Sequence, residues 1–210
     1  MIRFGGHNLV CVRSERIIFG GLDFRLSDGD ALVLVGPNGS GKSSLLRLMA
    51  GLMQPEAGEI AWDGDSIAAD REAHVGRCHY VGHADAIKPV LTVTESILFS
   101  SELRGRADRI AEALDAFGLR GLADMPGRFL SAGQKRRAAL ARLIAAPAAL
   151  WLLDEPTLAL DRASVAALEG AIAKHRAEGG IAVIATHTDL DLPGALELNL
   201  ASFKPAVAFA

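Results

Sequence analysis

The sequence has few cysteines, no long hydrophobic run and no signal-peptide pattern. Its two cysteines, Cys11 and Cys78, lack the spacing of metal ligands or of a redox motif, which favours a reducing cytoplasm. The most apolar stretch, residues 138–153, is interrupted by Arg142 and Pro147, so we expect no membrane-spanning segment. The N-terminus has no apolar core of the kind that directs secretion.

The charge is also low, because the formal net charge over 210 residues is -3. A chain with this balance has no general attraction to phosphate backbones, so we expect no nucleic acid partner. Hydrophobic residues make up 50% of the chain, enough for one sizeable core. No internal repeat, low-complexity segment or linker divides the sequence, so we expect a single domain over residues 1–210.

Hydrophobic periodicity predicts an α/β fold with a mostly parallel sheet. Short apolar stretches between residues 9 and 34 predict antiparallel strands, and the pattern changes to a helical insert at about residues 83–132. After Leu198 the pattern ends. The remaining predicted strands are 31–35, 149–153 and 181–185, and the predicted helices are 42–50, 108–117, 133–145 and 163–176.

A glycine-rich loop joins the strand at 31–35 to the following helix. Its sequence, Gly36-Pro37-Asn38-Gly39-Ser40-Gly41-Lys42-Ser43, matches the phosphate-loop pattern G-x-x-x-x-G-K-[ST]. We expect Lys42 to reach the β- and γ-phosphates of a nucleotide, Ser43 to ligate Mg²⁺, and Ser44 to belong to the same binding set. The alternative is a glycine-rich turn before a helix, which the Lys-Ser pair and the strand-helix context disfavour.

A second apolar strand ends in two carboxylates, in Leu150-Trp151-Leu152-Leu153-Asp154-Glu155. We expect Asp154 to hold Mg²⁺ through water and Glu155 to orient or deprotonate the attacking water. Without other motifs, an apolar strand that ends in Asp-Glu-Pro more often leads into a turn than into a catalytic site. The phosphate loop in the same chain favours the catalytic interpretation.

The segment Leu130-Ser131-Ala132-Gly133-Gln134 resembles the signature of ABC ATPases, Leu-Ser-Gly-Gly-Gln, with Ala132 replacing the first glycine. It opens a predicted helix, whose free N–H groups and dipole suit an anion. The resemblance implies that this anion is the γ-phosphate of ATP bound to a partner subunit. The alternative for Ser131 is a simple helix N-cap.

Two further positions are similar to motifs of the same family. Asp161, in Leu160-Asp161, resembles the D-loop aspartate, although it could be only the N-cap of the next helix. His187, in Ala185-Thr186-His187, resembles the switch histidine that contacts the γ-phosphate beside Lys42 and Glu155. The resemblance implies an ABC nucleotide-binding domain of the P-loop NTPase (RecA-like) class. It also implies a head-to-tail dimer that sandwiches two ATP molecules and separates after hydrolysis.

Two positions depart from the common family pattern. His83 stands where most members have a glutamine that touches Mg²⁺ and the membrane partner, and imidazole is a poorer Mg²⁺ ligand than an amide oxygen. Arg13 aligns with the usual adenine-stacking aromatic residue, and its guanidinium plane can also stack on a purine. Ile87, Lys88, Pro89 and Leu91 form a candidate contact surface for a membrane subunit, with a solvated loop as the alternative.

The histidine at position 83, the alanine in the signature, the charged residue at position 13 and the short C-terminus resemble the CcmA family. These proteins are the ATP-binding subunits of the cytochrome c maturation complex, long called the heme exporter. The resemblance implies a Mg²⁺-dependent, translocase-type ATP hydrolase, peripheral on the cytoplasmic face of the inner membrane. Its implied partners are a second ABC subunit and integral membrane subunits of the CcmB and CcmC type, with which it would release a heme-loaded chaperone.

Two other functions remain open from the sequence. One is a soluble ABC ATPase of iron–sulfur cluster scaffold assembly, which would usually be longer and carry glutamine at position 83. The other is the ATPase subunit of a different small-substrate ABC transporter.

Overall fold

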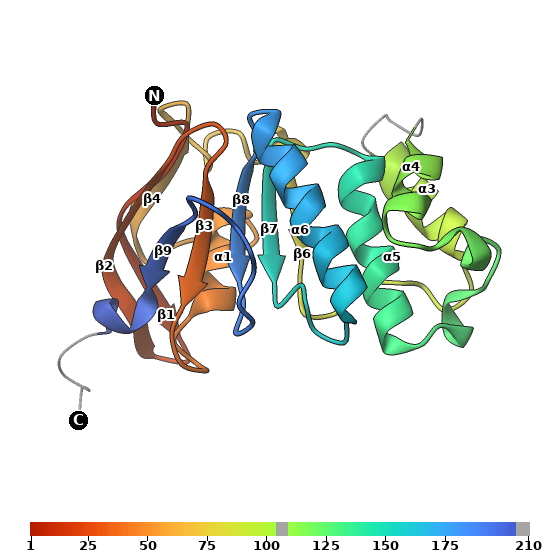
Figure 1. The fold of residues 1–210 in the computed structure, drawn as a ribbon. Helices are drawn as coiled ribbons and strands as arrows, with labels where there is room; N and C mark the ends of the chain where they lie inside the picture. Colours follow the sequence, from red (N-terminus) through yellow and green to blue (C-terminus); the bar gives the residue numbers. More distant parts are fainter. Residues whose placement is uncertain (104–108, 205–210) are drawn as a thin grey trace.

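The computed structural model describes residues 1–103 and 109–204, which form two sheets with helices on both faces of the second (Figure 1). The first sheet is antiparallel, with the order β2-β1-β4-β5. The second is parallel, with the order β6-β7-β8-β3-β9. This arrangement confirms the predicted α/β class with an antiparallel N-terminal part.

The antiparallel sheet is formed mainly by a long hairpin. Its strands are β1 (Phe4–Arg13), β2 (Arg16–Leu26), β4 (Ala57–Trp62) and β5 (Asp65–Ser66). The turn between β1 and β2 has only Ser14 and Glu15, both at positive φ, as a tight turn between twisted strands requires. Gly58 has φ +85° and lies over β1, where an added Cβ would collide with the carbonyl oxygens of His7 and Asn8. Glycine is therefore required where β4 meets β1.

The parallel sheet forms the centre of the molecule. Its strands are β3 (Ala31–Val35), β6 (Cys78–Val81), β7 (Leu150–Asp154), β8 (Ile181–Ala185) and β9 (Leu196–Asn199). Every residue of β7 and β8 is buried, because helices or the other sheet cover both faces. Along β7, Leu150 and Leu152 join one hydrophobic cluster while Trp151 and Leu153 join another, as the alternation of side chains in a strand dictates.

The helices divide between these two clusters. Helix α1 (Lys42–Met49) packs in the cluster that also holds the antiparallel sheet, while α5 (Ala132–Ala145) and α6 (Arg162–Ala177) pack on the other face of the parallel sheet (Figure 1). A short helix, α2 (Arg71–Arg77), precedes β6. The described residues contain no helix that is long and apolar enough to cross a bilayer.

The helical insert lies beside α5, between β6 and β7 in the chain (Figure 1). It contains α3 (Val93–Glu102), α4 (Ile110–Ala116), and the 3₁₀ turns η1 (Arg120–Leu122) and η2 (Gly127–Phe129). Thr92 and Glu95 form a capping box that starts α3. The helix expected from residue 108 begins at Ile110, and residue 108 itself lies outside the described residues.

The expected end of the fold at Leu198 was wrong. Strand β9 continues to Asn199 and pairs in parallel with β3, and a 3₁₀ turn, η3 (Leu200–Phe203), buries Leu200 completely. The sequence signal is weak because β9 is a short edge strand whose side chains are mostly exposed.

Gly58→Ala is expected to lower the free energy of unfolding by more than Gly64→Ala. Both glycines have positive φ, which costs an alanine about 1–2 kcal/mol. Only Gly58 faces backbone within contact distance, while Gly64 has no atom within 4 Å of an added Cβ. Urea denaturation of both variants measures the difference, and equal losses would contradict the close packing of β4 on β1.

Candidate active site

The site lies at the carboxyl ends of β3, β7 and β8, where loops from adjacent parallel strands meet. After β3, Gly36, Gly39 and Gly41 all have positive φ and wind the chain into a loop before α1. At Gly41 an added Cβ would lie 2.7 Å from Ile18 Cγ2, so both space and backbone require glycine there. The loop ends at the N-terminus of α1, where free N–H groups favour an anion.

Lys42 places its ammonium group inside this loop. The side chain is largely buried, at 8% exposed, and Nζ donates hydrogen bonds to Gly36 O (2.7 Å) and Pro37 O (3.3 Å). The same Nζ lies 3.3 Å from His187 Nε2. The positive charge therefore sits where the loop and the end of β8 meet.

Ser43 and Asp154 bring two oxygen ligands together. Ser43 Oγ donates to Asp154 Oδ1 over 3.1 Å, and Asp154 is buried at the end of β7. A hydroxyl and a carboxylate are the hard donors that Mg²⁺ prefers, usually with phosphate and water completing the shell. Within residues 1–103 and 109–204, no group of three or more His, Cys, Asp or Glu side chains could hold a metal. The pair fits a metal that a nucleotide helps to bind.

Glu155 and His187 form the polar wall opposite the loop. Glu155 has φ +48°, and its carboxylate accepts a hydrogen bond from the backbone N–H of His187 (3.3 Å). His187 Nε2 lies 3.6 Å from Glu155 Oε1 and 2.8 Å from Asn38 Oδ1. The structure thus brings Asn38, Lys42, Glu155 and His187 into one cluster.

The signature residues lie at the N-terminus of α5. Ser131 is its N-cap: Gln134 N donates to Ser131 Oγ, and Ser131 N donates to the side chain of Gln134. An added Cβ on Gly133 would lie 2.6 Å from Ala159 O, so this position of the signature requires glycine. In the part of the chain that the structure describes, no hydrogen bond or ion pair joins residues 130–134 to the phosphate loop.

Asp161 caps α6 by accepting a hydrogen bond from Ser164 N at 2.8 Å. Hydrogen bonds from Ser164 also lower the pKa of this carboxyl group. The N-cap interpretations of Ser131 and Asp161 are thereby confirmed, while their roles at a dimer interface stay predictions.

The two unusual positions are both exposed. His83 follows β6, and within the described residues its imidazole hydrogen-bonds to neither the phosphate loop nor β7. Arg13 is the last residue of β1, close to Cys11. Burial raises the pKa of the Cys11 thiol, and a hydrogen bond with Ser44 and the charge of Arg13 partly oppose this effect. The contact between Cys11 and Ser44 places the C-terminal part of β1 beside the first turn of α1.

Arg136 is a residue of the site that none of the sequence motifs predicted, and it stands in the basic run Lys135-Arg136-Arg137. The side chain is buried and donates to backbone groups of β7 and of the loop after β6. A basic run on a helix usually marks a solvated face. The spacing in the sequence nevertheless indicates burial. Arg136 lies three, four and seven residues before the apolar residues Ala139, Leu140 and Leu143, which puts it on the buried side of α5.

Comparisons with known proteins agree with this geometry. The ABC transporter family model matches residues 19–158. The chain is 63% identical over 203 residues to the cytochrome c biogenesis ATP-binding export protein CcmA of Rhodospirillum rubrum, covering 96% of this chain and 87% of that protein. It is 57% identical over 208 residues to the protein of the same name from Paramagnetospirillum magneticum, covering 97% and 96%.

Solved structures share the fold at lower identity. A putative ABC transporter ATP-binding protein from Pyrococcus furiosus superposes with a TM-score of 0.85 at 22% identity, covering 97% of this chain and all of that one. A dimeric ATP-binding cassette bound to ADP and Pi gives a TM-score of 0.78 at 24% identity, covering 88% of each chain. Together with the sequence matches, the architecture and the motifs place the chain in the ABC transporter ATP-binding family, within its CcmA group.

Proposed function

We propose that this chain is the ATP-binding and ATP-hydrolysing subunit of a membrane complex for cytochrome c biogenesis. The observation that carries the proposal is the cluster of Lys42, Glu155 and His187 around a phosphate loop, next to the Ser43–Asp154 pair. The relatives that are 57–63% identical are named as cytochrome c biogenesis ATP-binding export proteins. Their names favour this function over iron–sulfur scaffold assembly.

Phosphate binding would use groups that the loop already presents. Lys42 Nζ donates to two loop carbonyls, and phosphate oxygens are stronger acceptors that could replace them. The N–H groups at the start of α1 would add further donors. Bound at Ser43 and Asp154, Mg²⁺ would neutralise charge on the β- and γ-phosphates.

Water activation would fall to Glu155. Its carboxylate is oriented by the hydrogen bond from His187 N, and it lies at the strand end next to the metal-binding carboxylate. A carboxylate so placed can accept a proton from the water that attacks the γ-phosphate. His187, through Nε2, would contact the same phosphate.

The active assembly would be a head-to-tail dimer. Ser131 and Ala132 are exposed at the N-terminus of α5, where free N–H groups can bind an anion. Since no hydrogen bond or ion pair joins these residues to their own phosphate loop in the described part of the chain, the γ-phosphate they bind would belong to the second subunit. Asp161, exposed before α6, would lie at the same interface.

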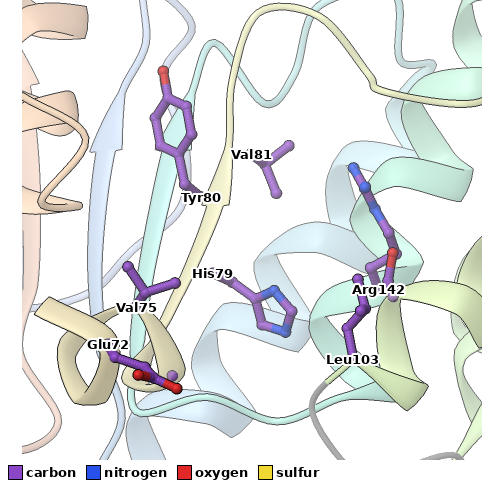
Figure 2. Close-up of a pocket in the computed structure, with 9 residues that line it drawn as sticks. Glu72, Val75, His79, Tyr80, Val81, Leu103 and Arg142 are labelled. Atoms are coloured by element: carbon purple, nitrogen blue, oxygen red, sulfur yellow. The ribbon is translucent and has the colours of Figure 1, made fainter.

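The membrane partner would dock beside the helical insert, on the cytoplasmic face of the membrane. A cavity of about 620 Å³ opens there between α2, β6, the C-terminal end of α3 and α5. Figure 2 shows Val75, Tyr80, Leu103 and Arg142 around it. Arg142 also donates to Asp85 O, which ties the cavity wall to the loop after β6. A short amphipathic helix of an integral membrane subunit of the CcmB or CcmC type is the occupant we propose.

Glu155→Gln is expected to lower ATP turnover about 100-fold or more while ATP binding is kept, because the amide cannot accept the proton. The trapped ATP should also hold the variant as a dimer. Phosphate release and size-exclusion chromatography with ATP and Mg²⁺ measure the two effects. Glu178→Gln, at an exposed site after α6, serves as the control, and unchanged turnover in Glu155→Gln would remove its assignment as the base.

Lys42→Ala is expected to weaken ATP binding about 10- to 100-fold, because charge-assisted hydrogen bonds to phosphate are lost. Equilibrium titration with a fluorescent ATP analogue measures the affinity. Lys204→Ala, on the exposed side after η3, should bind as the unaltered chain does. Normal affinity in Lys42→Ala would contradict the phosphate-loop assignment.

Val75→Glu is expected to abolish co-purification with integral membrane subunits from gently solubilised membranes, since it places a charge in the cavity. Val75 is 45% exposed, so the substitution should leave folding and basal ATP turnover intact. Leu52→Glu is a matched control, because Leu52 is 52% exposed and does not line the cavity. Retained membrane partners in Val75→Glu would overturn the proposed docking site.

A further inference from the structure

Arg136 is a buried cation beside the end of β7, and it makes no hydrogen bond to the residues expected to bind phosphate. Its side chain is 3% exposed, on the inner side of α5. A guanidinium group has five N–H donors in a fixed plane. All five find acceptors: Nε binds Pro156 O (3.1 Å), Nη1 binds Gly82 O and Asp85 Oδ1 (2.9 Å each), and Nη2 binds Asp154 O and Glu155 O (2.7 Å each).

Three of these acceptors are the consecutive carbonyls of Asp154, Glu155 and Pro156. In an extended strand, successive carbonyls point in opposite directions, so one group could not bind three in a row. The left-handed backbone of Glu155, at φ +48°, breaks this alternation. Glu155 thus has a backbone conformation that non-glycine residues rarely adopt. This conformation turns three consecutive carbonyls toward the planar guanidinium group of Arg136.

The other two acceptors belong to the loop after β6. Gly82 and Asp85 flank His83, and the Asp85 carboxylate balances the charge of Arg136. Arg142, six residues further along α5, donates to the carbonyl of Asp85 (2.9 Å). Two arginines of α5 therefore hold this loop, while one of them also holds the end of β7.

We propose that Arg136 is a positioning residue for ATP hydrolysis. By fixing the backbone turn at Glu155, it sets where the carboxylate stands relative to the attacking water. By binding Gly82 and Asp85 with the same group, it makes that setting depend on the position of the loop after β6. The inference rests on the proposed ATPase function and adds a residue to it that no phosphate-loop or signature motif contains.

Arg136→Lys tests this role, because lysine keeps the charge but has only three donors at one point. At least two of the five acceptors would lose their donor and the turn would loosen. A displacement of about 1 Å in a catalytic group can lower a rate about 100-fold, so we expect kcat to fall 10- to 100-fold. The Kd for ATP should stay within twofold, because Lys42 and its loop make no contact with Arg136.

The matched control is Arg137→Lys, the same change one position along α5. Arg137 donates to Phe117 O and Gly118 O, away from β7, so its kcat should remain within twofold. If Arg136→Lys and Arg137→Lys have equal kcat values, the positioning role is overturned. If the unaltered chain shows no ATP hydrolysis, the proposed function itself fails, which separates the two outcomes.

A double variant distinguishes positioning from general stabilisation. In a chain that already carries Glu155→Gln, adding Arg136→Lys should lower the residual turnover by less than twofold, because the carboxylate it positions is absent. A loss as large as in the single variant would show a structural effect only and would overturn the proposal.

Thermal unfolding and the stoichiometry of ATP binding check that the variants are folded. If Arg136→Lys does not fold, Asp85→Ala tests the same link from the loop, since Asp85 is partly exposed and its removal leaves Nη1 with Gly82 O as its one remaining acceptor. We expect kcat to fall at least about fivefold at an unchanged Kd for ATP. An unchanged kcat in Asp85→Ala would overturn the link between the loop and Glu155.

Discussion

The site depends on a sharp turn directly after a strand that is packed on both faces. All five residues of β7 are buried between two hydrophobic clusters, so the strand is fixed by packing on both faces. Asp154 ends it, and the left-handed backbone of Glu155 follows at once. An extended continuation would turn residue 155 to the opposite face of the sheet, away from the phosphate loop. Because of the turn, the carboxylates of Asp154 and Glu155 both lie at the edge of the sheet where the loops after β3 and β8 place Lys42 and His187.

The same packing separates the two halves of a nucleotide site. Helix α1 lies on one side of the parallel sheet and carries the phosphate loop, whereas α5 lies on the other and carries the signature at its N-terminus. Gly133 packs against Ala159, in the segment between Glu155 and Asp161, so the signature is held near the D-loop rather than near its own phosphate loop. This separation is the physical reason that a second subunit is needed in the proposed mechanism.

The sequence predicted the fold and the local motifs well, because each motif is contiguous. The phosphate loop and the end of β7 were placed within one or two residues, since glycines, a lysine and a buried apolar run carry the signal. Arg136 was missed because its burial is non-local: the pairing of β6 with β7 brings residues 82–85 and 154–156 together around it. Strand β9 was missed because an exposed four-residue edge strand has little pattern, and only its pairing with β3 defines it.

The central claim is that two chains complete each ATP site, and mixed dimers test it most directly. One chain carries Lys42→Ala and the other Ser131→Arg, so neither chain has both an intact phosphate loop and an intact signature. If the sites form between chains, the mixed dimer has one site made of intact halves. The account then predicts that each variant alone is inactive and that mixing restores ATP turnover. No recovery on mixing, with the mixed dimer demonstrated by differently tagged chains, would contradict the account.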